Sequence, residues 1–323
     1  MTRPKKKKNF IVIYILIVLV LCFVIYLLPK LSDTMTKTVI AEHGTMEISD
    51  EVECYAARTE KVYTAGSSGD TEYLVDEGEK VRKGTKVLNV SGSSSGEAGD
   101  EYSSLLERLG KSAKQTDSYT TATNGVISYF VDGYESTFTH KKIQKMTFDQ
   151  VEDIQNSYVN LSRKSVARGE PVYKIYKNEK WYMVFWIDEE SASDYKEGSS
   201  VTVRFEDGEI EAEIESIAQQ DDKFRVILAS DRYYKSLASF RTGTVTVITC
   251  TCSGLVLENS CITEKDGQKG VYVKSTAGEY VFKPVQILLE GQKKSVLTAS
   301  QYYDDDGKTV STIKIYDEVL RNP

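Results

Sequence analysis

The longest hydrophobic run of the chain lies close to its N-terminus. From Phe10 to Leu28 no residue is charged, and Pro29 and Lys30 follow directly. At a rise of about 1.5 Å per residue, this run is long enough to cross the hydrocarbon core of a bilayer. A cleaved signal peptide has a shorter apolar region followed by small residues, a pattern that this sequence lacks. We therefore predict a transmembrane helix over residues 10–29, embedded in the lipid bilayer.

The charges flanking this run predict its orientation. Residues 1–9 carry five basic side chains, whereas the whole chain has a formal net charge of −7. By the positive-inside rule the basic tip stays in the cytoplasm, so residues after about 30 are extracytoplasmic. No second apolar run approaches this length, which predicts a single-pass protein of the cytoplasmic membrane. An acidic body also argues against a nucleic-acid partner.

Beyond residue 44 the pattern changes to short runs of β-branched and aromatic residues separated by glycine turns. Residues 45–55 and 61–65 read as strands. The segment 69–90 then combines apolar strand interiors with Gly69, Gly78 and Gly84, and the last two stand where the chain must bend sharply. This pattern predicts a compact cluster of short strands.

A weaker copy of this segment follows at residues 123–133. Its Tyr-Phe-Val-Asp-Gly, which ends at Gly133, parallels the Tyr-Leu-Val-Asp-Glu-Gly that ends at Gly78, and Gly125 precedes it. One copy cannot close a hydrophobic core alone, so two copies predict a β-sandwich with approximate twofold symmetry.

These two segments resemble the biotinyl/lipoyl-like barrel-sandwich hybrid of HlyD-like membrane fusion proteins, the periplasmic adaptor subunits of bacterial efflux transporters. Val75–Leu88 matches the central glycine-rich motif of that family, and Thr121–Ser128 matches its return strand. Lipoyl carriers share the glycine spacing, but they need a modifiable lysine in a tight turn. Residues 91–120 are instead a long stretch rich in serine and glycine, so we reject a carrier and expect no cofactor.

In the adaptor family the insertion between the two halves is an α-helical hairpin. Here Tyr102, Leu105, Leu106 and Leu109 would share one face of a short helix within the insertion 92–120. A helix of a few turns departs from the long hairpins that reach an outer-membrane channel. The chain is thus identified as a divergent, short-hairpin member of this adaptor family. The short hairpin implies either a Gram-positive host or a reduced form of the adaptor.

The next two segments differ in character. Residues 139–168 are polar, and Thr147-Phe-Asp-Gln150 is a capping-box pattern that predicts a helix over 148–157, with a solvated linker as the alternative. From residue 169 the sequence is again rich in strand-forming residues, and Asp207-Gly208 is a hairpin turn signal. Six predicted strands suit a small closed barrel; they are 172–176, 181–187, 200–205, 209–217, 223–228 and 244–249.

The C-terminal region, 251–323, resembles the membrane-proximal β domain of the same adaptors. The resemblance is carried by Gly254–Leu257, Gly267–Val273, Tyr280–Val285 and Tyr316–Leu320. It implies that the strand after the anchor pairs back with this domain. The fold class expected is mainly β, with the following order: basic tip (1–9), transmembrane helix (10–29), stalk and pairing strand (30–60), barrel-sandwich hybrid (61–138), connector (139–168), β-barrel (169–250) and membrane-proximal β domain (251–323).

Residues that could carry chemistry are few. His43 and His140 stand far apart, no nucleotide or nucleophile motif is present, and the acidic turn 304–307 lacks the remaining ligands of a calcium loop. The extracytoplasmic cysteines read as small strand residues rather than as a disulfide or metal site; they are Cys54, Cys250, Cys252 and Cys261. We expect no catalysis and no metal.

The leading hypothesis is an extracytoplasmic adaptor of an export transporter, acting through protein–protein assembly. Its expected partners are an inner-membrane transporter (an ABC-type permease or similar), further copies of itself in a homo-oligomer, and the lipid bilayer. The alternative is a cell-envelope or cell-division scaffold that uses the adaptor fold without a transporter. The predicted site residues are structural turn glycines, namely Gly69, Gly78, Gly84, Gly125 and Gly133.

Overall fold

The structure is a computed structural model that describes residues 14, 16–19, 21, 37–92, 102–110, 113–154, 158–177 and 179–323. Most of the predicted transmembrane helix, 10–29, lies outside these residues. None of the helices that the structure does describe has the length and hydropathy needed to cross a bilayer. The chain forms two compact units, which we call the central unit (Ile48–Cys250) and the terminal unit (Met1–Glu47 with Thr251–Pro323).

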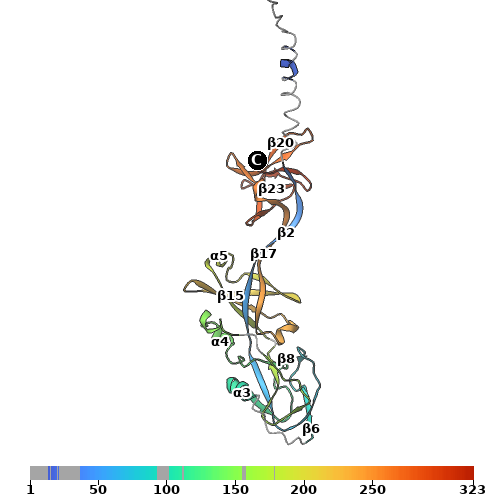
Figure 1. Ribbon diagram of the computed structural model, residues 1–323, viewed down its shortest axis with the longest axis vertical. Helices are drawn as coiled ribbons and strands as arrows, with labels where there is room; N and C mark the ends of the chain where they lie inside the picture. Colours follow the sequence, from blue (N-terminus) through green and yellow to red (C-terminus); the bar gives the residue numbers. More distant parts are fainter. Residues whose placement is uncertain are drawn as a thin grey trace, which may run out of the picture. The chain divides into compact units, whose positions relative to one another are not determined.

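The first part of the central unit is a barrel-sandwich hybrid of short strands, mainly β as predicted (Figure 1). A five-stranded sheet has the order β5-β8-β12-β3-β7, a three-stranded sheet has the order β11-β4-β6, and β9 pairs with β10. The pairing of β3 with β7 is parallel. The strand bounds are β3 Glu60–Ala65, β4 Gly69–Tyr73, β5 Lys80–Val81, β6 Leu88–Ser91, β7 Ala113–Thr116, β8 Gly125–Ser128, β9 Phe130–Val131, β10 Val159–Asn160, β11 Ser165–Val166 and β12 Pro171–Tyr176.

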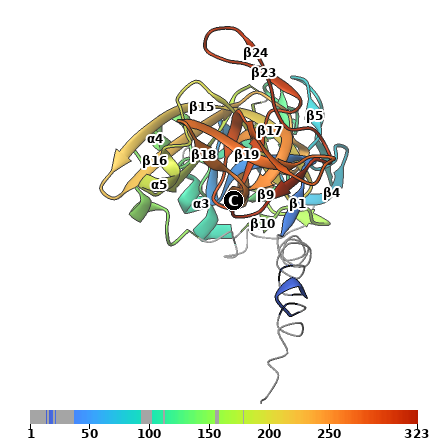
Figure 2. The ribbon, with the colours of Figure 1, turned by 90° about the horizontal axis from the view of Figure 1, so that it is seen from above.

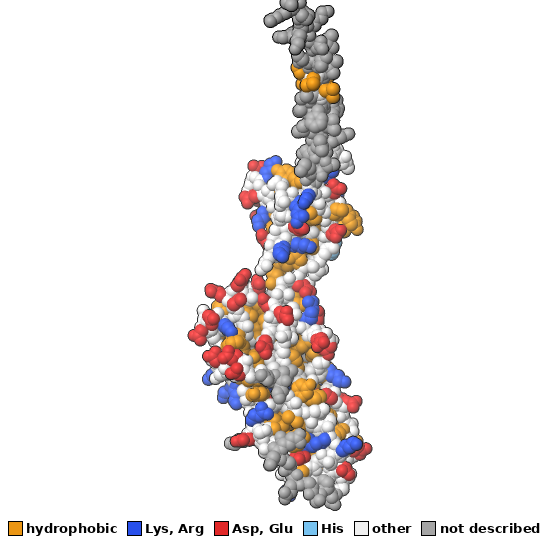
Figure 3. All heavy atoms as spheres, viewed as in Figure 1, with side chains coloured by type: hydrophobic (Ala, Val, Ile, Leu, Met, Phe, Trp, Pro, Cys, Tyr) orange, Lys and Arg blue, Asp and Glu red, His pale blue; other side chains and the backbone are white. Residues whose placement is uncertain are grey.

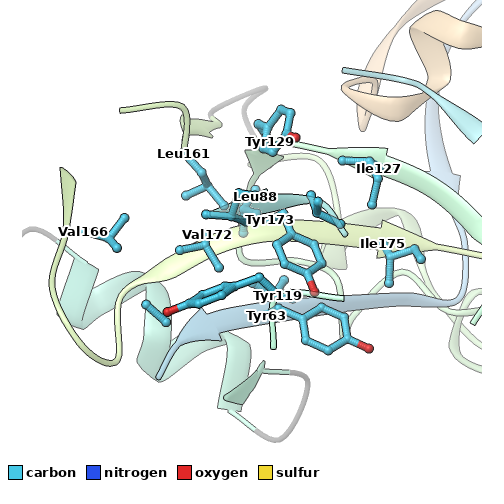
Figure 4. Packing of buried hydrophobic residues seen from close by; sticks show 14 of the residues in the cluster. Tyr63, Leu88, Tyr119, Ile127, Tyr129, Leu161, Val166, Val172, Tyr173 and Ile175 are labelled. Atoms are coloured by element: carbon cyan, nitrogen blue, oxygen red, sulfur yellow. The ribbon is translucent and has the colours of Figure 1, made fainter. Parts of the chain in front are cut away.

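Both predicted halves contribute to one hydrophobic core, as Figure 4 shows. The first half supplies Tyr73, whose ring meets that of Tyr129 from the second half edge-on, with 4.8 Å between the ring centroids. The rings of Tyr63 and Tyr173 stack in the same core at a centroid distance of 4.8 Å. The two halves therefore fold together, because neither buries its apolar face without the other.

The insertion contains the predicted short helix, α3, over Ser103–Leu109, and Leu105 and Leu109 on its apolar face are buried. The helical description of the insertion is wrong for residues 113–116, which form β7 instead. These residues pair with β3, whose backbone groups would otherwise stand unpaired at the edge of the sheet. Residues 93–101 and 111–112 lie outside the described part.

The second part of the central unit is a closed six-stranded β-barrel with the order β14-β15-β16-β13-β2-β17, and β14 pairs with β17 to complete it. One predicted member is wrong: residues 172–176 belong to β12 of the hybrid, where all six strand residues are buried between β3 and β8. Its place is taken by the end of β2, where Val52, Cys54 and Ala56 face the barrel core. The bounds are β2 Glu42–Ala57, β13 Trp181–Ile187, β14 Ser200–Phe205, β15 Gly208–Gln220, β16 Lys223–Ser230 and β17 Thr242–Glu258.

Strand β15 illustrates the alternation that forms this barrel. Ile210, Ala212 and Ile214 are buried, whereas Glu211 and Glu213 between them point outward. Acidic side chains consequently gather on the outer face of the barrel near β15 and the short helix α5 (Glu189–Ala192), as Figure 3 shows. A one-turn 3₁₀ helix, η5 (Lys235–Ala238), precedes β17.

The connector is ordered and packed, so the solvated-linker alternative is wrong. Phe138, Ile143, Met146 and Val151 are buried in one cluster with Tyr55 of the barrel. The predicted capping box of Thr147 and Gln150 is present, but it opens a 3₁₀ turn, η4 (Phe148–Gln150), rather than a helix over 148–157. Residues 155–157 lie outside the described part. A short α4 (His140–Ile143) precedes this turn.

The terminal unit is built on a second set of antiparallel strands. Strand β1 pairs with β25, which is the pairing that the family resemblance implied. The strands β23 and β24 form a hairpin that extends away from the sheets of this unit (Figure 2). Further bounds are β1 Thr38–Ile40, η6 Asn259–Cys261, β18 Thr263–Lys265, β19 Gln268–Lys274, β20 Tyr280–Pro284, β21 Ile287–Glu290, β22 Lys294–Leu297, β23 Gln301–Tyr303, β24 Thr309–Ser311 and β25 Glu318–Leu320.

Candidate functional site

The most unusual feature of the central unit is a cluster of six charged side chains buried where the hybrid meets the barrel. Every one of these side chains is at most 8% exposed. They come from the link between β2 and β3, from the start of β3, from the segment after β9, from β12 and from the residue before β17. The members of this buried charge cluster are Arg58, Glu60, Asp132, Glu135, Lys174 and Arg241.

Glu60 stands at the centre of the cluster. Its Oε1 lies 3.0 Å from Arg58 Nη2 and 3.2 Å from Lys174 Nζ, while its Oε2 pairs with Arg241. Strand register explains the arrangement, because Glu60 lies opposite Tyr176 and Val62 lies opposite Lys174, which places these side chains on one face of the sheet. That face is turned toward the barrel.

The two arginines also donate to backbone carbonyls. Arg58, which follows β2, donates to the carbonyl of Leu237 and, at 3.0 Å, to that of Phe240. Arg241 donates from Nη1 to the Ala56 carbonyl at 2.7 Å, and its Nε pairs with the Asp132 carboxylate at 2.7 Å. Each arginine thereby connects segments far apart in the sequence.

Glu135 completes the cluster. Its Oε1 accepts the backbone N–H of Asp132 at 3.1 Å and lies 3.4 Å from Lys174 Nζ. Its other carboxylate oxygen is buried and has no hydrogen-bond partner in the structure. Burial raises the pKa of Glu135, with the nearby Asp132 and Glu60 charges acting in the same direction.

Three cations face three carboxyl groups, and the strongest pairings set the protonation states. Burial alone would raise the pKa of Glu60, but Arg241, Arg58 and Lys174 outweigh it and hold this pKa far below its ordinary value. Burial likewise opposes the charge of Arg241, but Glu60 and Asp132 raise its pKa above the ordinary range. Glu60 and Arg241 therefore stay charged, and removing either charge leaves its partners uncompensated in a poorly solvated site.

A second contact connects the hybrid and the barrel nearby. The Tyr233 hydroxyl donates to the Gly78 carbonyl at 2.5 Å, and Lys80 Nζ lies 4.0 Å from the centroid of the Tyr233 ring. Together with the buried charge cluster, this contact can hold the two domains in one orientation. In the described part of the chain, no three His, Cys, Asp or Glu side chains are grouped as a metal site would require.

The predicted glycines are not brought together; each stands at a separate turn or close approach. Gly78, Gly84 and Gly133 have φ of +74°, +87° and +82°, a backbone conformation that side chains disfavour. Gly69 and Gly125 instead allow close packing, since a Cβ on them would lie 2.6 Å from the Ser91 carbonyl oxygen and 2.4 Å from the Tyr176 carbonyl oxygen. The effects of replacing them remain predictions.

The buried charge cluster was not found from the sequence, although one signal was present. Lys174 interrupts an otherwise apolar strand, and a charge in such a run needs a buried partner. Glu77, next to Gly78, has a role that the glycine motif did not predict. Its carboxylate accepts a hydrogen bond from the backbone N–H of Tyr129 at 2.6 Å, which connects the two halves of the hybrid. Burial raises the pKa of Glu77.

The remaining candidates are placed as follows. Cys54 and Cys261 are buried, Cys250 is exposed and Cys252 is partly buried, and all four are free thiols. His140 stacks on Tyr182 at a centroid distance of 4.0 Å, and its Nε2 lies 2.6 Å from the Glu215 carboxylate.

The hybrid and the barrel together define a class of protein in which a barrel-sandwich hybrid is followed by a β-barrel. Residues 60–177 match the family model "RND related, barrel-sandwich hybrid domain", and residues 181–251 match "RND related, beta-barrel domain". These matches cover more than half of the chain. The chain therefore belongs to the RND-related membrane fusion proteins, which is consistent with the resemblance that its motifs carry.

Two solved structures show distant similarity to the chain. ZneB from Cupriavidus metallidurans is 9% identical, with 88% of this chain and 92% of that chain covered, at a TM-score of 0.30. MacA from Actinobacillus actinomycetemcomitans is 11% identical, with 88% and 98% covered, at a TM-score of 0.35. At such TM-scores these likenesses carry no argument, so the family rests on the two domain matches. No curated protein matches the chain in sequence.

Proposed function

We propose that this chain is the extracytoplasmic adaptor of an export transporter and that it works by assembly rather than catalysis. The observation that carries the proposal is the succession of hybrid and barrel, matched by two RND-related domain models. The buried charge cluster supports it, because side chains held in fixed positions by ion pairs between the two domains suit a mechanical part.

The proposal includes a location and partners. A single transmembrane helix at residues 10–29 anchors the chain in the cytoplasmic membrane, with its N-terminus in the cytoplasm and residues after about 30 outside. The partner is an inner-membrane permease of the ABC type or similar, contacted by several copies of the chain. The basic tip followed by an uncharged run supports this orientation.

The length of the insertion favours a reduced adaptor. Of the insertion 92–120, α3 occupies seven residues and β7 occupies four. Even if two equal helices divided residues 92–112, the part of the insertion before β7, each would be at most about 16 Å long at 1.5 Å per residue, too short to reach a distant channel. This same feature favours the second candidate, an envelope or cell-division scaffold without a transporter.

One experiment separates the two functions. The full chain, tagged at its C-terminus, is crosslinked in intact membranes, purified and analysed by mass spectrometry, with an unrelated single-pass protein as the control. An export adaptor recovers a polytopic permease at levels well above the control. Recovery of cell-wall or division proteins in place of a permease supports the scaffold and overturns the adaptor.

A further inference from the structure

The core-facing side of the hybrid sheet ends in lysines rather than apolar residues. By strand register, Lys61 lies opposite Ile175, and Tyr63 lies opposite both Tyr173 and Lys114. Paired residues share a face, so Lys61 and Lys114 point to the side on which Tyr63 and Tyr173 form the core. Lys177 extends the same face, two residues beyond Ile175. All three lysine side chains are exposed at this end of the sheet.

These side chains line a half-open cavity of about 380 Å³. Its floor is apolar and aromatic, from Tyr63 and Ile175, and Figure 4 shows both at the same end of the core cluster. The three lysines and residues 122–123 line the rest. This volume is in the range of small-molecule sites, which run from about 300 to 1,000 Å³.

The cavity is electropositive. Glu60 is its single acidic lining residue, and its carboxylate is turned to the opposite face of the sheet, where the buried charge cluster neutralises it. Lys177 pairs with Glu179 at 3.7 Å, but the Glu179 side chain is 74% exposed, so this pair holds Lys177 only weakly. An anion entering the cavity meets up to three ammonium groups.

Tyr63 supplies a hydroxyl beside the lysines. The residue lines the cavity, although it is only 4% exposed overall. A phenol hydroxyl can donate one hydrogen bond, which an acceptor oxygen of a ligand in the cavity can take.

We propose that this cavity binds a soluble phosphate monoester with an apolar or aromatic body. The lysines pair with the phosphate oxygens, Tyr63 donates a hydrogen bond to one of them, and the body of the ligand lies on the Tyr63 ring and Ile175. A dianionic head matches several ammonium groups better than a monoanion does. The proposal goes beyond the adaptor function and does not depend on it.

The test uses the full chain in a neutral maltoside detergent and measures binding by calorimetry at low ionic strength. The probes are phenyl phosphate, phenol (the same body without the charge) and inorganic phosphate (the charge without the body). Phenyl phosphate is expected to bind one to one, and at least tenfold more tightly than either of the other two. Absence of phenyl phosphate binding overturns the proposal. Equal binding of phenol reduces the cavity to an apolar site, and equal binding of phosphate reduces it to an unspecific charged surface; either result overturns it.

Matched variants assign the site. Substituting Lys61, Lys114 and Lys177 together by Gln is expected to weaken phenyl phosphate binding at least tenfold, and Tyr63→Phe about three- to tenfold. A control triple with the exposed Lys145, Lys164 and Lys196 changed to Gln is expected to stay within twofold. If the control triple weakens binding as much as the cavity triple, the attraction is diffuse and the assignment is wrong. Thermal unfolding of each variant reports its folding, and the three wild-type probes decide the case without any variant.

Discussion

Replacing Glu60 by Gln tests the buried charge cluster most sharply. The substitution keeps the size of the side chain and removes one negative charge from among Arg58, Lys174 and Arg241, all at most 3% exposed. Breaking a buried ion pair by neutralising one partner costs about 3–5 kcal/mol, since the remaining charges keep their desolvation without their partner. We expect the free energy of unfolding of the central unit to fall by that amount.

The control is Glu211→Gln in the same unit. Glu211 pairs with Arg232 at 2.9 Å, but the two side chains are 72% and 63% exposed, so the change is expected to cost less than about 1 kcal/mol. Both tryptophans, Trp181 and Trp186, lie in β13, so tryptophan fluorescence during urea unfolding reports on the barrel.

If the free energy of unfolding falls by about 2 kcal/mol per M urea, the stability lost in Glu60→Gln lowers the urea midpoint by about 2 M. Equal midpoints for Glu60→Gln and Glu211→Gln would refute the reasoning, because the buried pairs would then be worth no more than a surface pair.

Three further predictions follow from the same structure. First, the folded-state pKa of Glu60 is held below its ordinary value, so the stabilisation that its charge provides is present above about pH 4.5 and is lost as the pH falls below that value. The difference in unfolding free energy between wild type and Glu60→Gln, measured by urea unfolding from pH 7 to 3, should therefore shrink in the acidic range. A difference that stays constant contradicts the assignment. Second, Gly125→Ala should be severely destabilising, because its Cβ would stand 2.4 Å from a carbonyl oxygen. The Cβ of Gly84→Ala meets open space, so this variant should cost only about 1–2 kcal/mol of backbone strain. Thermal unfolding should show the lower melting temperature for Gly125→Ala, and the reverse order contradicts the prediction. Third, a membrane-impermeant maleimide added to intact cells should label the exposed Cys250 but not the buried Cys54; labelling of Cys250 only after lysis contradicts the extracytoplasmic orientation.

Local patterns predicted most strands of the hybrid and the barrel. Strands β13 and β14 begin and end where their β-branched and aromatic runs do. The glycine-rich motif around Gly78 and its weaker copy around Gly125 were sufficient to place two halves in one core. These signals are local, because turns and alternation depend on a few neighbouring residues.

Membership of a sheet was harder to predict, because it depends on distant partners. Residues 172–176 read as a strand, but nothing within them indicates whether they complete a barrel or the hybrid. Strand β2 extends through both units, and no local pattern in its sequence predicts this. The connector shows the same limit, since its few apolar residues, such as Ile143, meet their partners only in the folded unit.

The buried charge cluster was the largest omission. Its six members are spread from Arg58 to Arg241, and each resembles an ordinary surface charge when viewed alone. Only Lys174, inside a fully buried strand, signals its environment. Pairing across such separations is a property of the tertiary fold rather than of any local pattern.

Native mass spectrometry of the complex isolated through this chain, released from membranes in a mild detergent without crosslinking, tests the central claim most directly. The adaptor function predicts masses that contain several copies of the chain together with a polytopic permease. Masses of the chain alone, or of the chain with wall-synthesis or division proteins, would contradict it.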